Sequence, residues 1–163
     1  MDTLRHLNTT RDELIHELHA IPDTLFSKQP DKTTWSPQQV TEHIALMDSY
    51  VASLLDRGKA VQKKVMKKPI RLTTLRSIKV KAPGPVDPAT QEKTKEDIYE
   101  LLFESRMQVL TLYKKFSKLE KRTFAMKHPV FGYLTVEQWF DFLGYHEKRH
   151  LKQLREVVSQ LKL

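Results

Sequence analysis

The C-terminal stretch of the chain, residues 135–161, reads TVEQWFDFLGYHEKRHLKQLREVVSQL. It begins with Thr135 and has Gln138 three residues later, which is the pattern of a capping box at the start of a helix. The apolar and histidine positions then recur at steps of three and four residues, namely Trp139, Phe142, Leu143, His146, His150, Leu154, Val157 and Leu161. This spacing predicts one long amphipathic helix from Thr135 to the C-terminus.

The same periodicity predicts three further helices upstream. Leucines and isoleucines at helical spacing place the first helix over residues 2–27, and Pro22 is the position at which this helix can be disturbed. The second is expected over residues 37–57, because Ser36 opens a capping box and is followed by a proline at the first helical position. The third is expected over residues 88–119, with Asp87 as its cap.

Four long amphipathic helices predict an all-α fold, a four-helix bundle formed by residues 1–163 as a single domain. The links between the first and second helices and between the third and fourth are short, which favours antiparallel neighbours. The link over residues 58–87 is long enough to cross the bundle and return. We therefore expect an up-down-down-up order with a long basic crossover between the second and third helices.

The composition excludes several classes of site. The chain has 163 residues, of which 39% are hydrophobic and none is cysteine, so disulfides, a cysteine nucleophile and thiolate metal sites are ruled out. No apolar run approaches the roughly 20 residues that a membrane helix needs, and the N-terminus lacks the apolar core of a secretory signal. We therefore expect a soluble, cytoplasmic protein without a membrane partner.

Most of the excess positive charge lies in one segment. The net charge is +8, and residues 58–86 contain nine Lys and Arg but no Asp or Glu. One interpretation is a solvated basic loop, and the other is that residues 59–81 bind an anionic partner such as a nucleic acid. The sequence supplies no base-reading or stacking surface, which weighs against nucleic acid.

Three of the seven histidines fall on predicted core faces. His146 and His150 are one helical turn apart and about 40° apart around the helix axis. His43 lies between Val40 and Met47 on the inner face of the second helix. Three imidazoles directed into one interior would form a metal site with positions left for water or substrate. Alternatively each is a hydrogen-bonded core residue, the commoner role for a single histidine on an apolar face.

Residues 146–150 also read HEKRH, which matches the HExxH pattern of zinc peptidases with Glu147 as the general base. Such an enzyme needs a third ligand after the motif. Glu156 lies about 240° around the helix from His150, on another face. We therefore expect no peptidase, and we interpret Glu147 and Arg149 as surface or interhelix ion-pair residues.

Two blocks of the sequence resemble the DinB-like superfamily, the DinB/YfiT group of small metalloenzymes. The first block is WSPxxVxEHI at residues 35–44, and the second is HPxFGxLTxxxWxxF followed by HExRHxxQ within residues 128–153. The resemblance implies an up-down-down-up four-helix bundle that holds zinc or nickel on three histidines. In this sequence they are His43, His146 and His150.

The resemblance implies two classes of chemistry on a small-molecule substrate. Some related proteins are S-transferases that use a low-molecular-weight thiol, bacillithiol or mycothiol, and others resemble metal-dependent hydrolases or isomerases. In both classes the metal lowers the pKa of a bound thiol or water and presents it as a nucleophile. The alternative is a bundle whose metal is structural or absent and which acts as an interaction module.

Two further residues are candidates for lining the pocket. Tyr50 lies one turn beyond Met47 on the inner face of the second helix, and its alternative role is ordinary core packing. His128 precedes the fourth helix, and its alternative role is to shape that loop.

The neighbouring aromatic residues Trp139 and Phe140 bear on oligomeric state. Side chains of consecutive helical residues diverge by about 100°, so both cannot face the same core. We expect one of them to be covered by residues 58–87 or by a second subunit, and we predict a homodimer.

Overall fold

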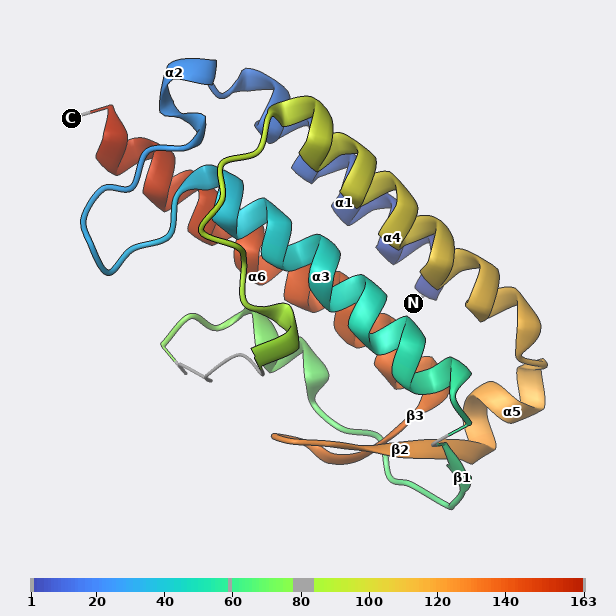
Figure 1. The fold of residues 1–163 in the computed structure, drawn as a ribbon. Coiled ribbons are helices and arrows are strands. Elements are labelled where there is room, and N and C mark those ends of the chain that lie inside the picture. The colour runs from blue at the N-terminus through green and yellow to red at the C-terminus, as the bar shows by residue number, and fades with distance from the viewer. Residues whose placement is uncertain (1, 59, 78–83, 163) are drawn as a thin grey trace.

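The computed structural model describes residues 2–58, 60–77 and 84–162. Its long helices have 18 to 26 residues and are α1 (Thr3–Ala20), α3 (Pro37–Asp56), α4 (Lys95–Lys115) and α6 (Val136–Leu161). α1 and α6 run in one direction, and α3 and α4 run in the other (Figure 1). The predicted four-helix bundle is therefore confirmed, with its up-down-down-up order.

Capping boxes fix the starts of α3 and α6, as predicted. The hydroxyl of Ser36 accepts a hydrogen bond from the backbone N–H of Gln39, and the hydroxyl of Thr135 accepts one from Gln138, both at 3.2 Å. In each box the glutamine side chain returns a bond to the backbone of the capping residue. Two donors that the first helical turn leaves free are thus satisfied locally.

The start of α4 was predicted wrongly. The helix begins at Lys95, and its cap is Thr94 instead of Asp87. Thr94 accepts a hydrogen bond from the N–H of Asp97 at 3.1 Å, and the Asp97 carboxylate accepts one from the N–H of Thr94 at 2.8 Å. Asp87 has Thr90 three residues later, so no carboxylate or amide is available there to complete the box.

Two short helices replace the ends of helices predicted as longer. The chain leaves helical geometry after α1 and resumes as α2 (Asp23–Phe26) immediately after Pro22, so the predicted helix over 2–27 is broken at this proline. α5 (Lys118–Thr123) follows α4 after a new cap at Ser117.

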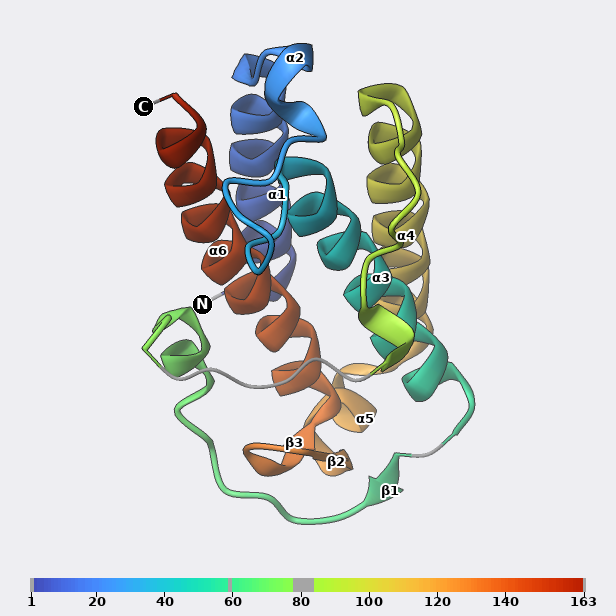
Figure 2. The ribbon, with the colours of Figure 1, turned by 60° about the vertical axis from the view of Figure 1, so that its left-hand side comes forward.

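A small sheet, which the sequence did not predict, closes one end of the bundle. Its antiparallel strands, in the order β1 (Val61–Gln62), β2 (Phe124–His128) and β3 (Gly132–Thr135), lie beside the end of α3 and the start of α6 (Figure 2). Ala125 is the partner of Val61 on one side and of Thr135 on the other. Gly132 allows the tight β2–β3 turn because its φ of 70° is unfavourable for other residues.

Both aromatic residues at the start of α6 are buried, one against the hairpin and the other against α4. Trp139 is only 4% exposed and donates a hydrogen bond from its indole Nε1 to the carbonyl of Met126 in β2, at 3.1 Å. Phe140 is fully buried and packs edge-on against Tyr113 of α4, with ring centroids 5.0 Å apart. Ile70 and Val86 of the predicted cover, residues 58–87, belong to the same apolar cluster as these two rings, and the predicted homodimer stays a prediction.

The segment between α3 and α4 crosses the bundle, as predicted. It includes two 3₁₀ turns, η1 (Ile70–Thr74), which packs against α6, and η2 (Gly84–Val86), which packs against α3. Arg149 of α6 donates to the carbonyls of Thr73 and Leu75. Arg76 forms an ion pair with Glu156 at 3.0 Å, while most other basic side chains in residues 60–77 are exposed. Lys59, Lys79 and Lys81 lie outside the described residues.

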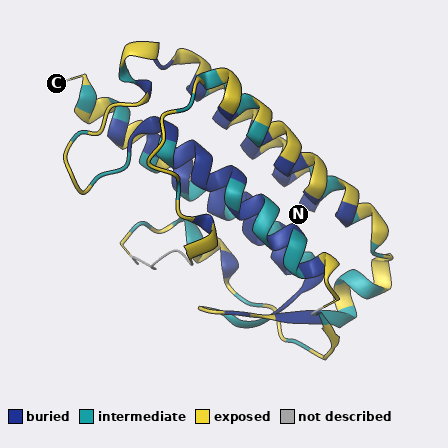
Figure 3. Ribbon diagram, viewed as in Figure 1, coloured by how far each residue is buried: buried dark blue, intermediate teal, exposed yellow. Residues whose placement is uncertain are grey.

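The interior of the bundle holds two apolar clusters. Figure 3 shows the buried residues on the inward faces of the long helices. The cluster at the sheet end includes Leu7, Val51, Val109 and Leu143. The cluster at the opposite end includes Leu14, Ile44, Leu102 and Leu154. Between them each long helix contributes one buried charged residue, and we call these four residues the polar layer: Arg11, Asp48, Arg106 and Glu147. In the described part of the chain, the helices are too short or too polar to span a membrane.

Candidate metal centre

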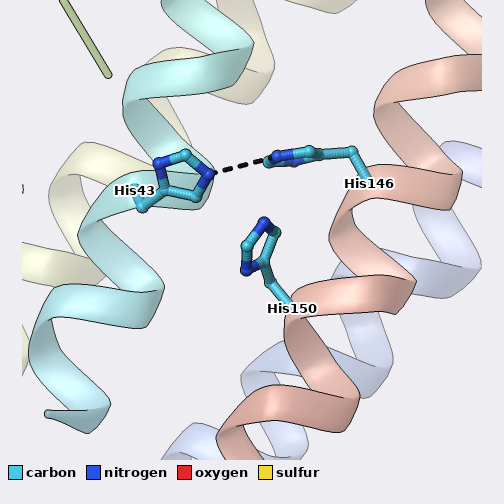
Figure 4. A group of neighbouring side chains, drawn as sticks. All are labelled: His43, His146 and His150. Atoms are coloured by element: carbon cyan, nitrogen blue, oxygen red, sulfur yellow. Dashed lines mark hydrogen bonds between the residues drawn. The ribbon is translucent and has the colours of Figure 1, made fainter. Parts of the chain in front are cut away.

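Three histidines meet inside the bundle. His43 comes from α3, and His146 and His150 come from consecutive turns of α6. One nitrogen from each ring lies within 4.8 Å of the others, and all three residues are at least nine-tenths buried. In Figure 4 a ring nitrogen of His150 points toward the gap between the other two rings. The sequence prediction that these side chains converge is thus confirmed in geometry.

The outer nitrogens of two rings are held by oxygen acceptors. Nδ1 of His43 donates to the carbonyl oxygen of Val86 at 2.7 Å, and Nδ1 of His150 donates to the amide oxygen of Gln153 at 2.8 Å. Each oxygen only accepts, so Nδ1 carries the proton and Nε2 of the neutral ring keeps a lone pair. The surroundings therefore select the tautomer that leaves Nε2 free to bind a metal.

The spacing of the rings fits a divalent cation. Nε2 of His43 and Nε2 of His146 are 3.2 Å apart. Two nitrogens bound to one zinc ion at about 2.0–2.1 Å lie about 2.8–3.4 Å apart for bond angles of roughly 90–110°. Little movement is then needed for these two rings to share one ion. Imidazole nitrogens suit both zinc and nickel.

The protonation state favours the same role. Burial lowers the pKa of His43, and it lowers the pKa of His146 and of His150 well below the usual 6.5. The imidazoles of His150 and His43 lower the pKa of His146 further, and His43 does the same for His150, where the hydrogen bond to Gln153 raises the pKa without outweighing burial. The Val86 carbonyl acts in the opposite direction on His43 without outweighing burial. The rings are therefore neutral at pH 7, as metal ligation requires.

Comparison with known proteins identifies the family of the chain. Residues 6–154 match the sequence profile described as the DinB superfamily. The chain belongs to this superfamily. It is 33% identical over 158 residues to the uncharacterized protein YuaE of Bacillus subtilis (strain 168), a match that covers 94% of this chain and 96% of YuaE.

Two solved structures share the fold. The crystal structure of TT2238, described as a four-helix bundle protein, has a TM-score of 0.64 at 24% identity, over 94% of this chain and 96% of TT2238. YfiT from Bacillus subtilis has a TM-score of 0.60 at 15% identity, over 98% of this chain and 86% of YfiT. YfiT is described as a probable metal-dependent hydrolase with an unusual four-helix bundle topology.

Aromatic rings wall the three histidines of this DinB-superfamily chain. Trp35, which precedes α3, lies 5.0 Å from the ring of His43 and 6.5 Å from the ring of His150, measured between centroids. Phe142, one turn before His146 on α6, has its ring 5.7 Å from that imidazole. The histidine cluster thus has an aromatic neighbour on the side of α3 and another on α6.

The structure gives different positions to the two candidate pocket residues. Nδ1 of His128 accepts hydrogen bonds from the backbone N–H groups of Val130 and Phe131, so His128 shapes the turn between β2 and β3. Its ring packs 4.6 Å from Phe142, and burial lowers its pKa to about 4. Tyr50 is half-buried against the apolar cluster at the sheet end. A pocket-lining role stays a prediction for both.

Glu147, the candidate general base of the HExxH pattern, belongs to the polar layer. Its side chain is fully buried and accepts hydrogen bonds from Nε of Arg11 at 2.6 Å and from Nη2 of Arg106 at 2.5 Å. Asp48 completes the layer by accepting from the same two guanidiniums at 3.0 and 2.9 Å. Each Glu147 oxygen therefore accepts a hydrogen bond from an arginine. The prediction that Glu147 is an interhelix ion-pair residue is confirmed, and the alternative that it lies on the surface was wrong.

The rest of the polar layer was missed from the sequence, although one signal for it exists. Arg11 lies four residues after Leu7 and three before Leu14, so it falls on the buried stripe of α1. A charged residue on such a stripe is expected to be paired, because an isolated buried charge is costly. The partners themselves lie on three other helices and are not indicated by any local spacing.

Proposed function

We propose that the chain is a metal-dependent enzyme in which His43, His146 and His150 hold one divalent cation, zinc or nickel. The observation that carries this proposal is the convergence of three buried, neutral imidazoles, two of which have Nδ1 fixed by an acceptor. When bound, such a cation lowers the pKa of a coordinated water or thiol and makes it a nucleophile near neutral pH.

The number of ligands supports a catalytic site over a structural one. Within residues 2–58, 60–77 and 84–162, no fourth His, Cys, Asp or Glu joins the three histidines. Structural zinc sites are closed by four protein ligands, whereas catalytic sites keep a position for water or substrate. A hydrolase is the first class to test, because YfiT is described as a probable metal-dependent hydrolase. An S-transferase that takes a low-molecular-weight thiol at the same position is the second.

The chain's own residues have distinct tasks in this proposal. The carbonyl of Val86 and the amide of Gln153 orient the imidazoles of His43 and His150 and keep each Nδ1 protonated. Trp35 and Phe142 restrict the volume beside the nitrogens and exclude bulk water. Because the histidines are buried, the substrate that suits the site is a small molecule. The proposal also places the protein in the cytoplasm.

Metal content provides the test that does not depend on knowing the substrate. We expect the purified chain to bind about one zinc or nickel ion after loading, and His43→Ala, His146→Ala or His150→Ala to remove most of it. His16→Ala on the exposed face of α1 is the control and should bind as the wild type does. Gln153→Ala should weaken metal affinity by about 10–100-fold, because it removes the acceptor that orients His150.

Two outcomes would overturn the proposal at different points. Equal metal content in the wild type and in the variant with all three histidines replaced by Ala would refute both the metal site and the enzymatic function proposed for it. Stoichiometric metal with no turnover of ester, amide or thiol-conjugation substrates, and with no exchangeable water on the ion, would leave a non-catalytic metal-binding bundle. Binding of nucleic acid through residues 59–81 that is lost at high salt would instead support the interpretation of this basic segment as a site for an anionic partner.

A further inference from the structure

The outer face of α4 carries a stripe of side chains with the spacing of a helix interface, all exposed except the half-buried Leu110. The residues recur at alternating steps of four and three, and we call them the α4 stripe: Glu96, Glu100, Phe103, Met107, Leu110 and Lys114. At 100° per residue they all lie within about 80° of arc, opposite the buried face of the helix. Phe103 is 67% exposed and Met107 is 46% exposed. α4 lies at the outer edge of the bundle in Figures 1 and 2, and its outer side is largely exposed in Figure 3.

The charged residues at the two ends of the α4 stripe form no ion pair with the other described residues of the chain. Among the described residues, Glu96, Glu100 and Lys114 take part in none of the ion pairs within 4.0 Å. The neighbouring Lys115 does pair, with Asp56 at 3.3 Å. The stripe therefore presents an acidic N-terminal end, an apolar centre and a basic C-terminal end, with its end charges available to a partner.

The stripe is complementary to itself when a second copy is turned end for end. With the crossing point midway between Phe103 and Met107, Phe103 of one chain faces Met107 of the other. In the same register Glu96 faces Lys114 and Glu100 faces Leu110, and the two-fold axis repeats all three contacts. A parallel arrangement would instead place glutamate against glutamate and lysine against lysine. Charge complementarity thus favours one occupant in one orientation, an antiparallel second copy.

We infer that α4 is the interface of a two-fold homodimer in which the two α4 stripes pack antiparallel. The stripe from Glu96 to Lys114 is about 27 Å long at 1.5 Å per residue. A single pair of helices of this length lies at the small end of specific interfaces, so the dimer dissociates on dilution. The inferred homodimer therefore rests on the α4 stripe and not on the burial of Trp139 and Phe140. It also lies on the side of α4 away from the bundle interior, so its test is independent of the metal site.

A charge-swap experiment tests the inference with full-length protein. Light scattering and sedimentation velocity are measured over an about hundredfold range of concentration, for which the wild type should move from the chain mass of 19.2 kDa toward twice that mass. Glu96→Lys creates two lysine pairs in the homodimer, and Lys114→Glu creates two glutamate pairs. Each should weaken self-association about tenfold or more.

The decisive measurement is the mixture of the two variants. Every end contact between a Glu96→Lys chain and a Lys114→Glu chain joins a lysine to a glutamate, so the mixture should form a heterodimer of near wild-type affinity. Glu13→Lys and Lys28→Glu, exposed positions outside the stripe, are charge-matched controls and should not change the mass. Phe103→Asp should weaken the dimer in every combination, because it places a charge in the apolar centre.

Three results would overturn the inference. A wild-type mass that stays at 19.2 kDa across the range would exclude the homodimer and leave the stripe to a different partner. A dimer that Glu96→Lys and Lys114→Glu leave unchanged would place the interface elsewhere on the chain. Weakening by both variants without recovery in the mixture would exclude the antiparallel register. Far-ultraviolet circular dichroism of each variant checks that the fold is retained.

Discussion

Replacing Glu147 by Gln keeps the shape of the side chain and removes one charge from the polar layer. In the wild type the two guanidiniums of Arg11 and Arg106 face the two carboxylates of Asp48 and Glu147, and all four residues are buried. Burial opposes the charge on Arg106, but Asp48 and Glu147 outweigh it and raise the pKa of Arg106. Glu147→Gln therefore leaves a net positive charge buried in the centre of the bundle.

Breaking a buried pair in this way costs about 3–5 kcal/mol in the free energy of unfolding. For a domain of this size that corresponds to a fall in Tm of about 10 °C. Urea and thermal unfolding at pH 7 measure it, with Glu156→Gln as the control, because that carboxylate is 54% exposed and its pair with Arg76 is worth about 1 kcal/mol or less. A cost for Glu147→Gln no larger than the control would refute the reasoning.

A double variant separates lost charge balance from lost packing. Arg11→Met with Glu147→Met removes one charge of each sign and leaves Asp48 paired with Arg106 at 2.9 Å. We expect this double variant to be more stable than Glu147→Gln alone, because no unpaired charge remains buried. If the double variant were less stable than Glu147→Gln, packing of the long side chains would dominate over charge.

Two further predictions concern His6, a buried residue of α1. A Cβ at Gly144 would lie 2.4 Å from the His6 ring, so Gly144→Ala should destabilise the wild type by about 1–2 kcal/mol. In a His6→Ala background the clash is absent, and the same change should stabilise the protein by up to about 1 kcal/mol. Urea unfolding of the four proteins checks this reversal, and the same sign in both backgrounds would contradict it. Burial lowers the pKa of His6 and of His128 to about 4, below the value of about 6.5 for an unfolded chain, so stability is full above pH 6.5 and falls toward pH 4. The slope per histidine approaches about 1.4 kcal/mol per pH unit in metal-free protein, and His6→Gln should make it shallower in unfolding experiments at pH 7, 6 and 5.

Helix starts could be predicted from the sequence where the signal is local. The boxes at Ser36 and Thr135 each involve residues three apart, and both helices begin as expected. The box at Thr94 uses an aspartate, a weaker pattern, and Asp87 before a proline was the more typical cap. The strands β2 and β3 were missed because Ala125 and Met126 are buried in succession, which hides the alternation typical of a strand.

The candidate site could be predicted only in part. His146 and His150 were identifiable because their four-residue spacing and apolar neighbours place them on one inward face, and the family blocks linked them to His43. The acceptors at Val86 and Gln153 were not predicted as partners of these rings. Val86 lies 43 residues from His43 and reaches it only through the path of the crossover, which no local pattern specifies.

The polar layer also sets the height of each helix in the bundle. Sliding a helix by one turn would shift its side chains by about 5.4 Å, which an apolar cluster of leucine, isoleucine and valine tolerates by exchanging similar neighbours. The same slide would carry Arg11 or Arg106 out of reach of both carboxylates. The polar layer thus fixes the axial position of each helix, which the apolar clusters alone would not specify. Since any single replacement leaves a lone charge behind, its members are free to change in evolution only as pairs of opposite charge or all together.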